Sequence, residues 1–183
     1  MTDLARRIYD TAHISGQFTL RSGASSTEYF DKYLFESDPV LLRDVAAALA
    51  ERLSDVLGPP RGPAGGVQAV AGLELGGVPI AVALSNVTGL PTLFVRKQAK
   101  TYGTCKLAEG GRVSGRRLLV AEDVVTSGGQ VLASVEDLRQ RGAIVDVVAC
   151  VIDRESGGRQ ALAAAGLELR ALFTMSELKE TAA

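Results

Sequence analysis

Histidine and cysteine, which most metal sites and disulfide frameworks need, are scarce in this 183-residue chain. The two cysteines, Cys105 and Cys150, form no CxxC pair and predict no disulfide. The one histidine, His13, lies in an amphipathic N-terminal segment, where we interpret it as a surface or packing residue. Because there is no His or Cys cluster, we expect neither a zinc site nor a transition-metal site.

Long apolar runs and a strong net charge are also missing. No apolar run reaches the roughly 18–20 residues of a membrane span, and the N-terminal MTDLARRIYD lacks the apolar core of a secretion signal. We therefore expect a cytoplasmic protein with no membrane partner. The net charge of −1 gives no reason to expect a nucleic-acid partner.

Basic residues are nevertheless concentrated in one segment, residues 96–117, whose only acidic residue is Glu109. In a chain that is nearly neutral overall, such a segment favours binding of a small polyanion over a long one. The basic residues are Arg96, Lys97, Lys100, Lys106, Arg112, Arg116 and Arg117.

Apolar strands and helical segments alternate along most of the chain, which is long enough for one domain. The alternation predicts an α/β fold with a doubly wound, mostly parallel sheet flanked by helices. Ligands bind such sheets at the C-terminal ends of the strands. We expect strands over residues 67–71, 91–95, 118–121, 144–152 and 167–173, and helices over 79–87, 130–141 and 159–165.

Before the sheet, the pattern predicts a helix over residues 3–13 and an extended segment over 17–35. Asp38-Pro39 predicts the start of another helix, which we expect to continue to Leu57. The loops expected to leave the C-terminal ends of the strands cover residues 72–77, 96–116 and 122–130.

The most informative segment is RLLVAEDVVTSGGQ, residues 117–130. An apolar strand is followed by Glu122 and Asp123, whose carboxylates can accept hydrogen bonds from two sugar hydroxyls. The Thr-Ser-Gly-Gly turn then offers backbone N–H groups and a helix N-terminus to an anion. An acidic turn with a Ser or Thr N-cap would explain the hydroxyls. It would not explain two carboxylates at the end of a buried strand, so the segment favours a ribose 5-phosphate site.

Two further loops have a structural and a functional interpretation each. The glycines at 72, 76 and 77 fit either a tight turn or a close backbone approach to a diphosphate. The basic loop after residue 95 could be a solvated connector, but its length favours a functional loop, and its glycines would let it close. Neither GxxxxGK[ST] nor a GxGxxG between a strand and a helix is present.

Several motifs resemble those of one family. VAEDVVTSGG resembles the phosphoribosyl diphosphate (PRPP) signature of the type I phosphoribosyltransferases, and four more segments narrow the resemblance to the orotate phosphoribosyltransferases. The N-terminal segment Phe18-Thr-Leu-Arg21-Ser-Gly with Tyr29-Phe30-Asp31 is similar to the family's F-x-L-K-S-G…Y-F-D hood. The segment Arg96-Lys97-Gln-Ala-Lys100-Thr-Tyr102-Gly is similar to its RKxxKxHG loop. Near the C-terminus, Asp153-Arg154-Glu-Ser-Gly-Gly is similar to its DR-x-x-GG turn, and Leu172-Phe173-Thr-Met-Ser-Glu-Leu is similar to its LFTxSEL ending.

The resemblance implies transfer of the phosphoribosyl group of PRPP to orotate, giving orotidine 5′-monophosphate. Glu122 and Asp123 would hold the ribose hydroxyls, and the residues after them the 5-phosphate. Three residues, Lys100, Arg96 and Asp123, would act in catalysis. The PRPP-binding residues would be Arg96, Lys97, Lys100, Tyr102, Glu122, Asp123, Val124, Val125, Thr126, Ser127, Gly128, Gly129 and Gln130, and the orotate-binding residues Thr126, Arg154, Arg21 and Phe30.

The resemblance also implies Mg²⁺ as cofactor, held mainly by the substrate diphosphate and ribose hydroxyls and by no protein ligand directly. It implies a homodimer in which the 96–104 loop is shared across the interface. Residues 1–183 would form one phosphoribosyltransferase domain, and residues 1–35 would contribute a hood over the base.

The chain departs from the family pattern at three positions. Arg21 and Tyr102 replace a lysine and a histidine that are usual in the family, and Gly76 replaces a lysine that some members carry in the diphosphate loop. Two alternatives stay open at this point: a phosphoribosyltransferase for another base, and a PRPP-sensing regulator on the same fold.

Overall fold

A six-stranded sheet forms the centre of the protein, with the strands in the order β5-β4-β3-β6-β7-β8. The computed structural model describes residues 2–19, 23, 25–58, 66–98 and 107–181. All neighbouring strands are parallel except β4 and β5. The strands are β3 (Ala69–Leu73), β4 (Thr92–Val95), β5 (Ala108–Glu109), β6 (Arg117–Val125), β7 (Ile144–Asp153) and β8 (Glu168–Thr174).

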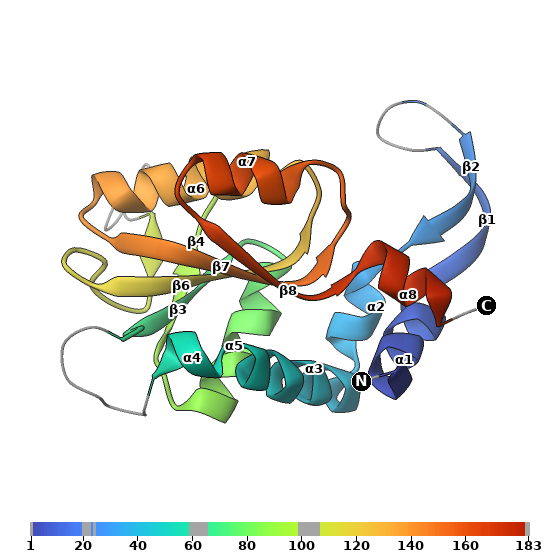
Figure 1. Cartoon of the computed structure of the whole chain (residues 1–183), viewed down its shortest axis with the longest axis horizontal. Coiled ribbons are helices and arrows are strands. Elements are labelled where there is room, and N and C mark those ends of the chain that lie inside the picture. Colours follow the sequence, from blue (N-terminus) through green and yellow to red (C-terminus); the bar gives the residue numbers. More distant parts are fainter. Residues whose placement is uncertain (1, 20–22, 24, 59–65, 99–106, 182–183) are drawn as a thin grey trace.

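Helices cover both faces of this sheet (Figure 1). On one face lie α3 (Pro39–Arg52), α4 (Ser54–Leu57) and α5 (Gly77–Thr88), and on the other α6 (Gly129–Gln140) and α7 (Gly158–Ala164). Successive strand residues point to opposite faces, so Leu119 and Ala121 belong to one apolar core and Leu118 and Val120 to the other. The predicted doubly wound α/β fold is confirmed.

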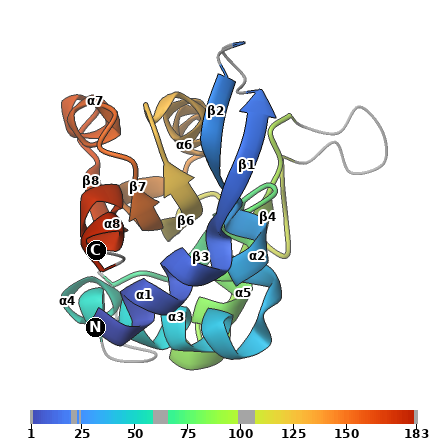
Figure 2. The ribbon, with the colours of Figure 1, turned by 90° about the vertical axis from the view of Figure 1, so that its right-hand side faces the viewer.

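The N-terminal segment and the last helix lie together at the end of the sheet where the parallel strands finish (Figure 2). They comprise α1 (Thr2–Ala12), the antiparallel hairpin of β1 (His13–Thr19) and β2 (Ser25–Phe30), α2 (Lys32–Ser37) and α8 (Met175–Glu180). Ile8 of α1 and Phe35 of α2 are fully buried in the core that contains α3. The hairpin therefore projects from elements that are packed into the main domain.

The expected extended segment over residues 17–35 is wrong over its last four residues, which begin α2. Asp31 caps this helix by accepting a hydrogen bond from the Tyr33 N–H, 3.1 Å away. Tyr33 and Phe35 favour strands by propensity, but burial of Phe35 on the helix outweighs that preference. Asp38 caps α3 as predicted, by accepting hydrogen bonds from two backbone N–H groups.

Other boundaries also differ from the sequence pattern. The expected helix from Pro39 to Leu57 is broken at Leu53 into α3 and α4, and the expected loop over 96–116 contains the short edge strand β5. The expected strand over 118–121 continues to Val125, because β7 pairs with it as far as Asp153. Within the described ranges, no helix is both long enough and apolar enough to cross a membrane.

Candidate active site

The two adjacent carboxylates of the central motif lie inside β6, near its C-terminal end. Asp123 is fully buried, and its Oδ1 accepts a hydrogen bond of 2.6 Å from the Val124 N–H. Glu122 is partly exposed, but its Oε2 is buried and has no hydrogen-bond partner within the described part of the chain. Burial and then the charge of Asp123 raise the pKa of Glu122 to about 9. A ligand hydroxyl would satisfy an oxygen of this kind.

The turn after β6 leads directly into the N-terminus of α6. Its cap is Gly128, whose φ of +79° lies in the left-handed region that glycine adopts without strain. Within the described chain no side chain caps this helix, although Thr126 and Ser127 are exposed nearby. The predicted alternative, a Ser or Thr N-cap, is therefore wrong. The uncapped N–H groups and the helix dipole favour an anion at this position.

Val124 and Val125 form the link between the carboxylates and this turn. Val125 is 1% exposed, and Val124 packs against the core beside α3. Their side chains thus contribute to packing, while the Val124 N–H and the Val125 carbonyl are bonded to Asp123 and Arg154. Gly129 and Gln130 are exposed in the first turn of α6, where Gln130 donates a hydrogen bond to Ser134.

Arg96 and Lys97 follow β4, beside the loop that joins β3 to α5. The Lys97 N–H donates a hydrogen bond of 2.6 Å to the Glu74 carboxylate in that loop. The Nε of Arg96 is buried and finds no acceptor in the described ranges. An unpaired guanidinium nitrogen at a sheet edge is a favourable place for an oxyanion.

The basic segment from 96 to 117 does not gather at one site. Arg116 and Arg117 lie at the opposite end of β6 from its carboxylates, where Arg116 binds the Gln68 carbonyl and Arg117 pairs with Asp146. Arg112 precedes them on the same connection. The extended strand separates these arginines from Arg96, so they do not contribute to a common anion site.

Arg154 directly follows β7. The last paired residues of β6 and β7 are Val125 and Asp153, so Arg154 lies one position beyond this pair. The Arg154 N–H donates to the Val125 carbonyl at 2.8 Å. Thr126 and Arg154 are therefore neighbours at the ends of adjacent parallel strands. The structure thus brings together two residues for which the resemblance implies a role in orotate binding.

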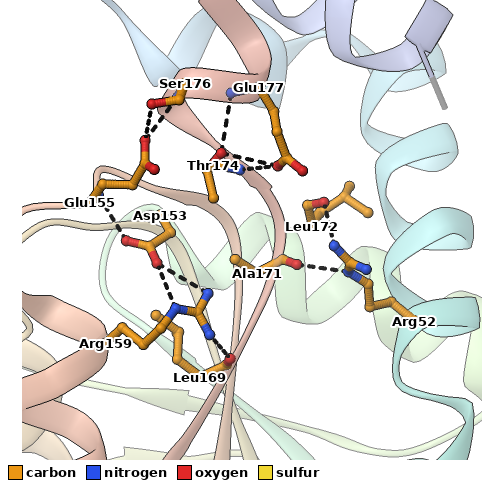
Figure 3. Close-up of polar contacts among 10 residues, drawn as sticks. All are labelled: Arg52, Asp153, Glu155, Arg159, Leu169, Ala171, Leu172, Thr174, Ser176 and Glu177. Carbon is orange, nitrogen blue, oxygen red and sulfur yellow. Dashed lines mark hydrogen bonds and ion pairs between the residues drawn. The ribbon is translucent and has the colours of Figure 1, made fainter.

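The turn that carries Arg154 is anchored on both sides (Figure 3). The buried Asp153 carboxylate accepts hydrogen bonds from the Glu155 N–H (2.9 Å) and from Arg159 Nε (3.2 Å). Glu155, whose φ is +56°, accepts hydrogen bonds from both the N–H and the hydroxyl of Ser176 in α8. Those two hydrogen bonds hold the pKa of Glu155 below its usual value. The contacts tie the Arg154 turn to the last helix.

A cavity of about 290 Å³ lies between this turn and the hairpin. Arg154 lines one side of it and Phe30 another, so the structure brings together two residues predicted to bind the base. The other lining residues come from α1 and the hairpin, which belong to the hood expected over residues 1–35, and from α8, which the sequence had not linked to the base. They are Tyr9, His13, Ser26, Glu28, Tyr29, Met175 and Lys179.

Three residues that the resemblance predicts to bind PRPP or orotate lie outside the described residues: Lys100, Tyr102 and Arg21. Gly72 and Gly77 are explained by packing, since a Cβ at either would lie within 2.7 Å of backbone or side-chain atoms of the protein itself. Lys32 and Glu36 of α2, next to Asp123, were missed because no local pattern marks a residue about 90 positions away as a neighbour.

Comparison with known proteins reveals extensive similarity, although no protein-family model matches the chain. An orotate phosphoribosyltransferase from Nocardioides sp. is 53% identical over 175 residues, which cover 96% of this chain and 92% of that protein. The crystal structure of Mycobacterium tuberculosis orotate phosphoribosyltransferase in complex with inorganic phosphate has a TM-score of 0.83 and 28% identity, and the match covers 97% of each chain. The same enzyme in complex with PRPP gives a TM-score of 0.80 with 28% identity, over 97% of this chain and 98% of that one.

The sequence likeness extends over almost the whole length of both proteins, and the fold likeness covers 97% of each of the two chains compared. The chain therefore belongs to the orotate phosphoribosyltransferase family.

Proposed function

We propose that this protein transfers the 5-phosphoribosyl group of PRPP to N1 of orotate, giving orotidine 5′-monophosphate and diphosphate for pyrimidine (UMP) biosynthesis. The observation that carries the proposal is the position of Arg154. It lies next to the sugar-phosphate turn and lines the 290 Å³ cavity beneath the hairpin. A guanidinium there can meet the orotate carboxylate with two parallel hydrogen bonds.

PRPP binds across the ends of β6 and β4 in this proposal. Glu122 and Asp123 hold the ribose hydroxyls, and the turn from Thr126 to Gln130 holds the 5-phosphate through backbone N–H groups and hydroxyls. Arg96 and Lys97 meet the diphosphate, joined by Lys100 and Tyr102 from the adjoining loop. The buried Glu122 Oε2 and Arg96 Nε, both without a partner among the described residues, support this placement.

Mg²⁺ is the proposed cofactor. Within the described residues, His, Cys, Asp and Glu form no group of three or more that could hold a metal ion. In this proposal the ion is held by the oxygens of the diphosphate and the ribose hydroxyls, which are ligands that Mg²⁺ prefers. When bound there, the ion would neutralise charge on the leaving diphosphate.

In the proposed mechanism, the residues of this chain stabilise the charge on the leaving group and position orotate for attack. As the bond from C1 of ribose to the diphosphate breaks, positive charge builds on C1 and negative charge on the leaving group. Arg96 and Lys100 stabilise the leaving group, and Arg154 holds orotate so that N1 attacks C1 with inversion and gives up its proton to the departing diphosphate. No protein nucleophile is required. Cys150 is buried, which raises the pKa of its thiol and makes it unsuited to such a role.

The test is to mix the protein with magnesium, PRPP and orotate and to follow the ultraviolet absorbance of orotate. The proposal predicts a change that requires all three components. Turnover with uracil or a purine, but none with orotate, would instead select a phosphoribosyltransferase for another base. Binding of PRPP without turnover of any base would select a PRPP-sensing regulator.

A homodimer is part of the proposal, with the 96–104 loop shared across the interface. An apolar groove of about 570 Å³ between α3 and α5 supports it, together with exposed apolar side chains on α5 and β4. Val82 (39% exposed) and Val87 (47%) lie on α5, and Phe94 (39%) lies on β4 just before Arg96. Light scattering during gel filtration should give twice the mass of the chain, and Val82→Asp should shift the protein towards the monomer.

A further inference from the structure

Lys32, in the first turn of α2, contacts the proposed ribose site from outside the sheet. Its Nζ lies 2.5 Å from Oδ2 of Asp123, which is fully buried. The Lys32 side chain is 31% exposed. Burial acts to lower the pKa of Lys32, but the hydrogen bond and the charge of Asp123 outweigh it and raise that pKa. Lys32 is therefore a cation at neutral pH, and it is a counter-ion of Asp123.

The β3–α5 loop makes room for this ion pair. A Cβ added at Gly76 would lie 1.5 Å from Oδ2 of Asp123, the oxygen that faces Lys32. No side chain larger than that of glycine fits there while Asp123 keeps this orientation. The carboxylate is thus held by the Val124 N–H and by Lys32, and the absence of a side chain at Gly76 leaves the space that it occupies.

Two more acidic side chains surround the pair. Glu36, one helical turn after Lys32, is 7% exposed, and burial followed by the hydrogen bond and charge of Asp123 raises its pKa to about 9. The pKa of Glu122 is raised in the same direction, mainly by burial. One ammonium group cannot neutralise three clustered carboxylates, and the raised pKa values of Glu36 and Glu122 leave Asp123 as the carboxylate with which Lys32 pairs.

We infer that Lys32 is a positioning residue for the phosphoribosyl transfer: its ammonium group holds the Asp123 carboxylate, which lies in the space that Gly76 leaves for it, in the orientation that accepts a hydrogen bond from a ribose hydroxyl. The inference rests on the proposed function, because it assigns Asp123 to PRPP. Lys32 acts through Asp123 and does not itself contact the reacting atoms. Its loss should therefore weaken binding of PRPP and leave recognition of orotate by Arg154 intact.

The experiment measures the Kd of magnesium-PRPP by calorimetry in the full-length protein without orotate. Lys32→Met removes the charge while keeping an unbranched side chain, and it should raise this Kd by about tenfold or more, the effect of losing a hydrogen bond to a charged group. Lys32→Arg retains the charge and should restore part of the affinity. Arg7→Met is the control, because it breaks a 2.9 Å ion pair with Asp44 away from the site, and it should change the Kd by less than about twofold.

A double-mutant cycle separates positioning from a general structural role. In the Asp123→Asn background there is no carboxylate left to orient, so Lys32→Met should change the Kd by less than about twofold. The double variant also contains no uncompensated buried charge, so it remains informative if Lys32→Met alone does not fold. A tenfold loss in that background would overturn the inference.

The outcomes distinguish this inference from the proposed function. Wild-type protein that does not bind magnesium-PRPP contradicts the proposed function and the inference together. Wild-type protein that binds it, with Lys32→Met binding equally well or Arg7→Met weakened to the same extent, contradicts the inference alone.

Discussion

Replacing Glu36 by Gln should change how the stability of the protein depends on pH. Glu36 is 7% exposed, and burial together with Asp123 raises its pKa from 4.5 to about 9. Between those two values the folded protein retains a proton on Glu36 that the unfolded chain has released. Because the unfolded state then binds fewer protons, the free energy of unfolding falls as the pH rises through this window.

The size of the effect follows from the number of protons. One extra proton in the folded state gives a slope of up to about 1.4 kcal/mol per pH unit. For a chain of this length, that corresponds to a change in Tm of about 3–6 °C per pH unit. Gln has the shape of a protonated Glu and does not titrate, so Glu36→Gln should remove this contribution. Glu122 also has a raised pKa and should leave a residual slope.

Calorimetry from about pH 4 to pH 8.5 would measure Tm for the wild type and for Glu36→Gln. The two proteins should have similar Tm values at the acidic end, and the variant should become the more stable one as the pH rises. Glu51→Gln, at an exposed position on α3, is the matched control and should follow the wild type. Parallel curves for the wild type and Glu36→Gln would refute the assignment of a proton to Glu36.

Three further changes test other parts of the site. Lys100→Ala should lower kcat by about 10²-fold, the loss expected for one electrostatic contact, without changing the circular dichroism spectrum. Unchanged turnover would exclude Lys100 and its loop from catalysis. Glu155→Ala removes both hydrogen bonds to Ser176 and should raise the KM for orotate by about threefold to tenfold. Glu155→Gln should have a smaller effect. An equal rise in the KM for PRPP would argue against a link between Glu155 and Arg154. Gly128→Ala puts a residue with a Cβ at a position whose φ is +79°, so it should cost about 1–2 kcal/mol of stability and weaken PRPP binding. Unaltered PRPP affinity would show that the turn does not hold the 5-phosphate.

Much of the fold was predictable because its signals are local. The apolar strands of a parallel sheet are buried on both faces, so β6 and β7 appear as apolar runs followed by glycine-containing turns. The Glu122–Gly129 segment and the Asp153–Gly158 turn also contain their functional residues within a few positions. Both could therefore be assigned to sheet-edge loops without coordinates.

The remaining features depend on contacts between distant parts of the chain. The strand β6 extends beyond its apolar run because β7 pairs with it, and α2 forms in a segment that the pattern predicts to be extended because Phe35 is buried. Lys32 reaches Asp123 only after the chain has folded. Clustering of the basic residues between 96 and 117 was misleading, because β6 carries Arg117 to the end of the sheet opposite the carboxylates.

The central claim is that a carboxylate-binding arginine lies beside a phosphoribosyl site, and comparison of orotate with uracil tests it most directly. The two bases differ only in the carboxylate, so kcat/KM should be far higher for orotate in the wild type. Arg154→Met should remove most of that preference by lowering kcat/KM for orotate alone. Equal use of both bases by the wild type, or an unchanged preference in Arg154→Met, would contradict the account.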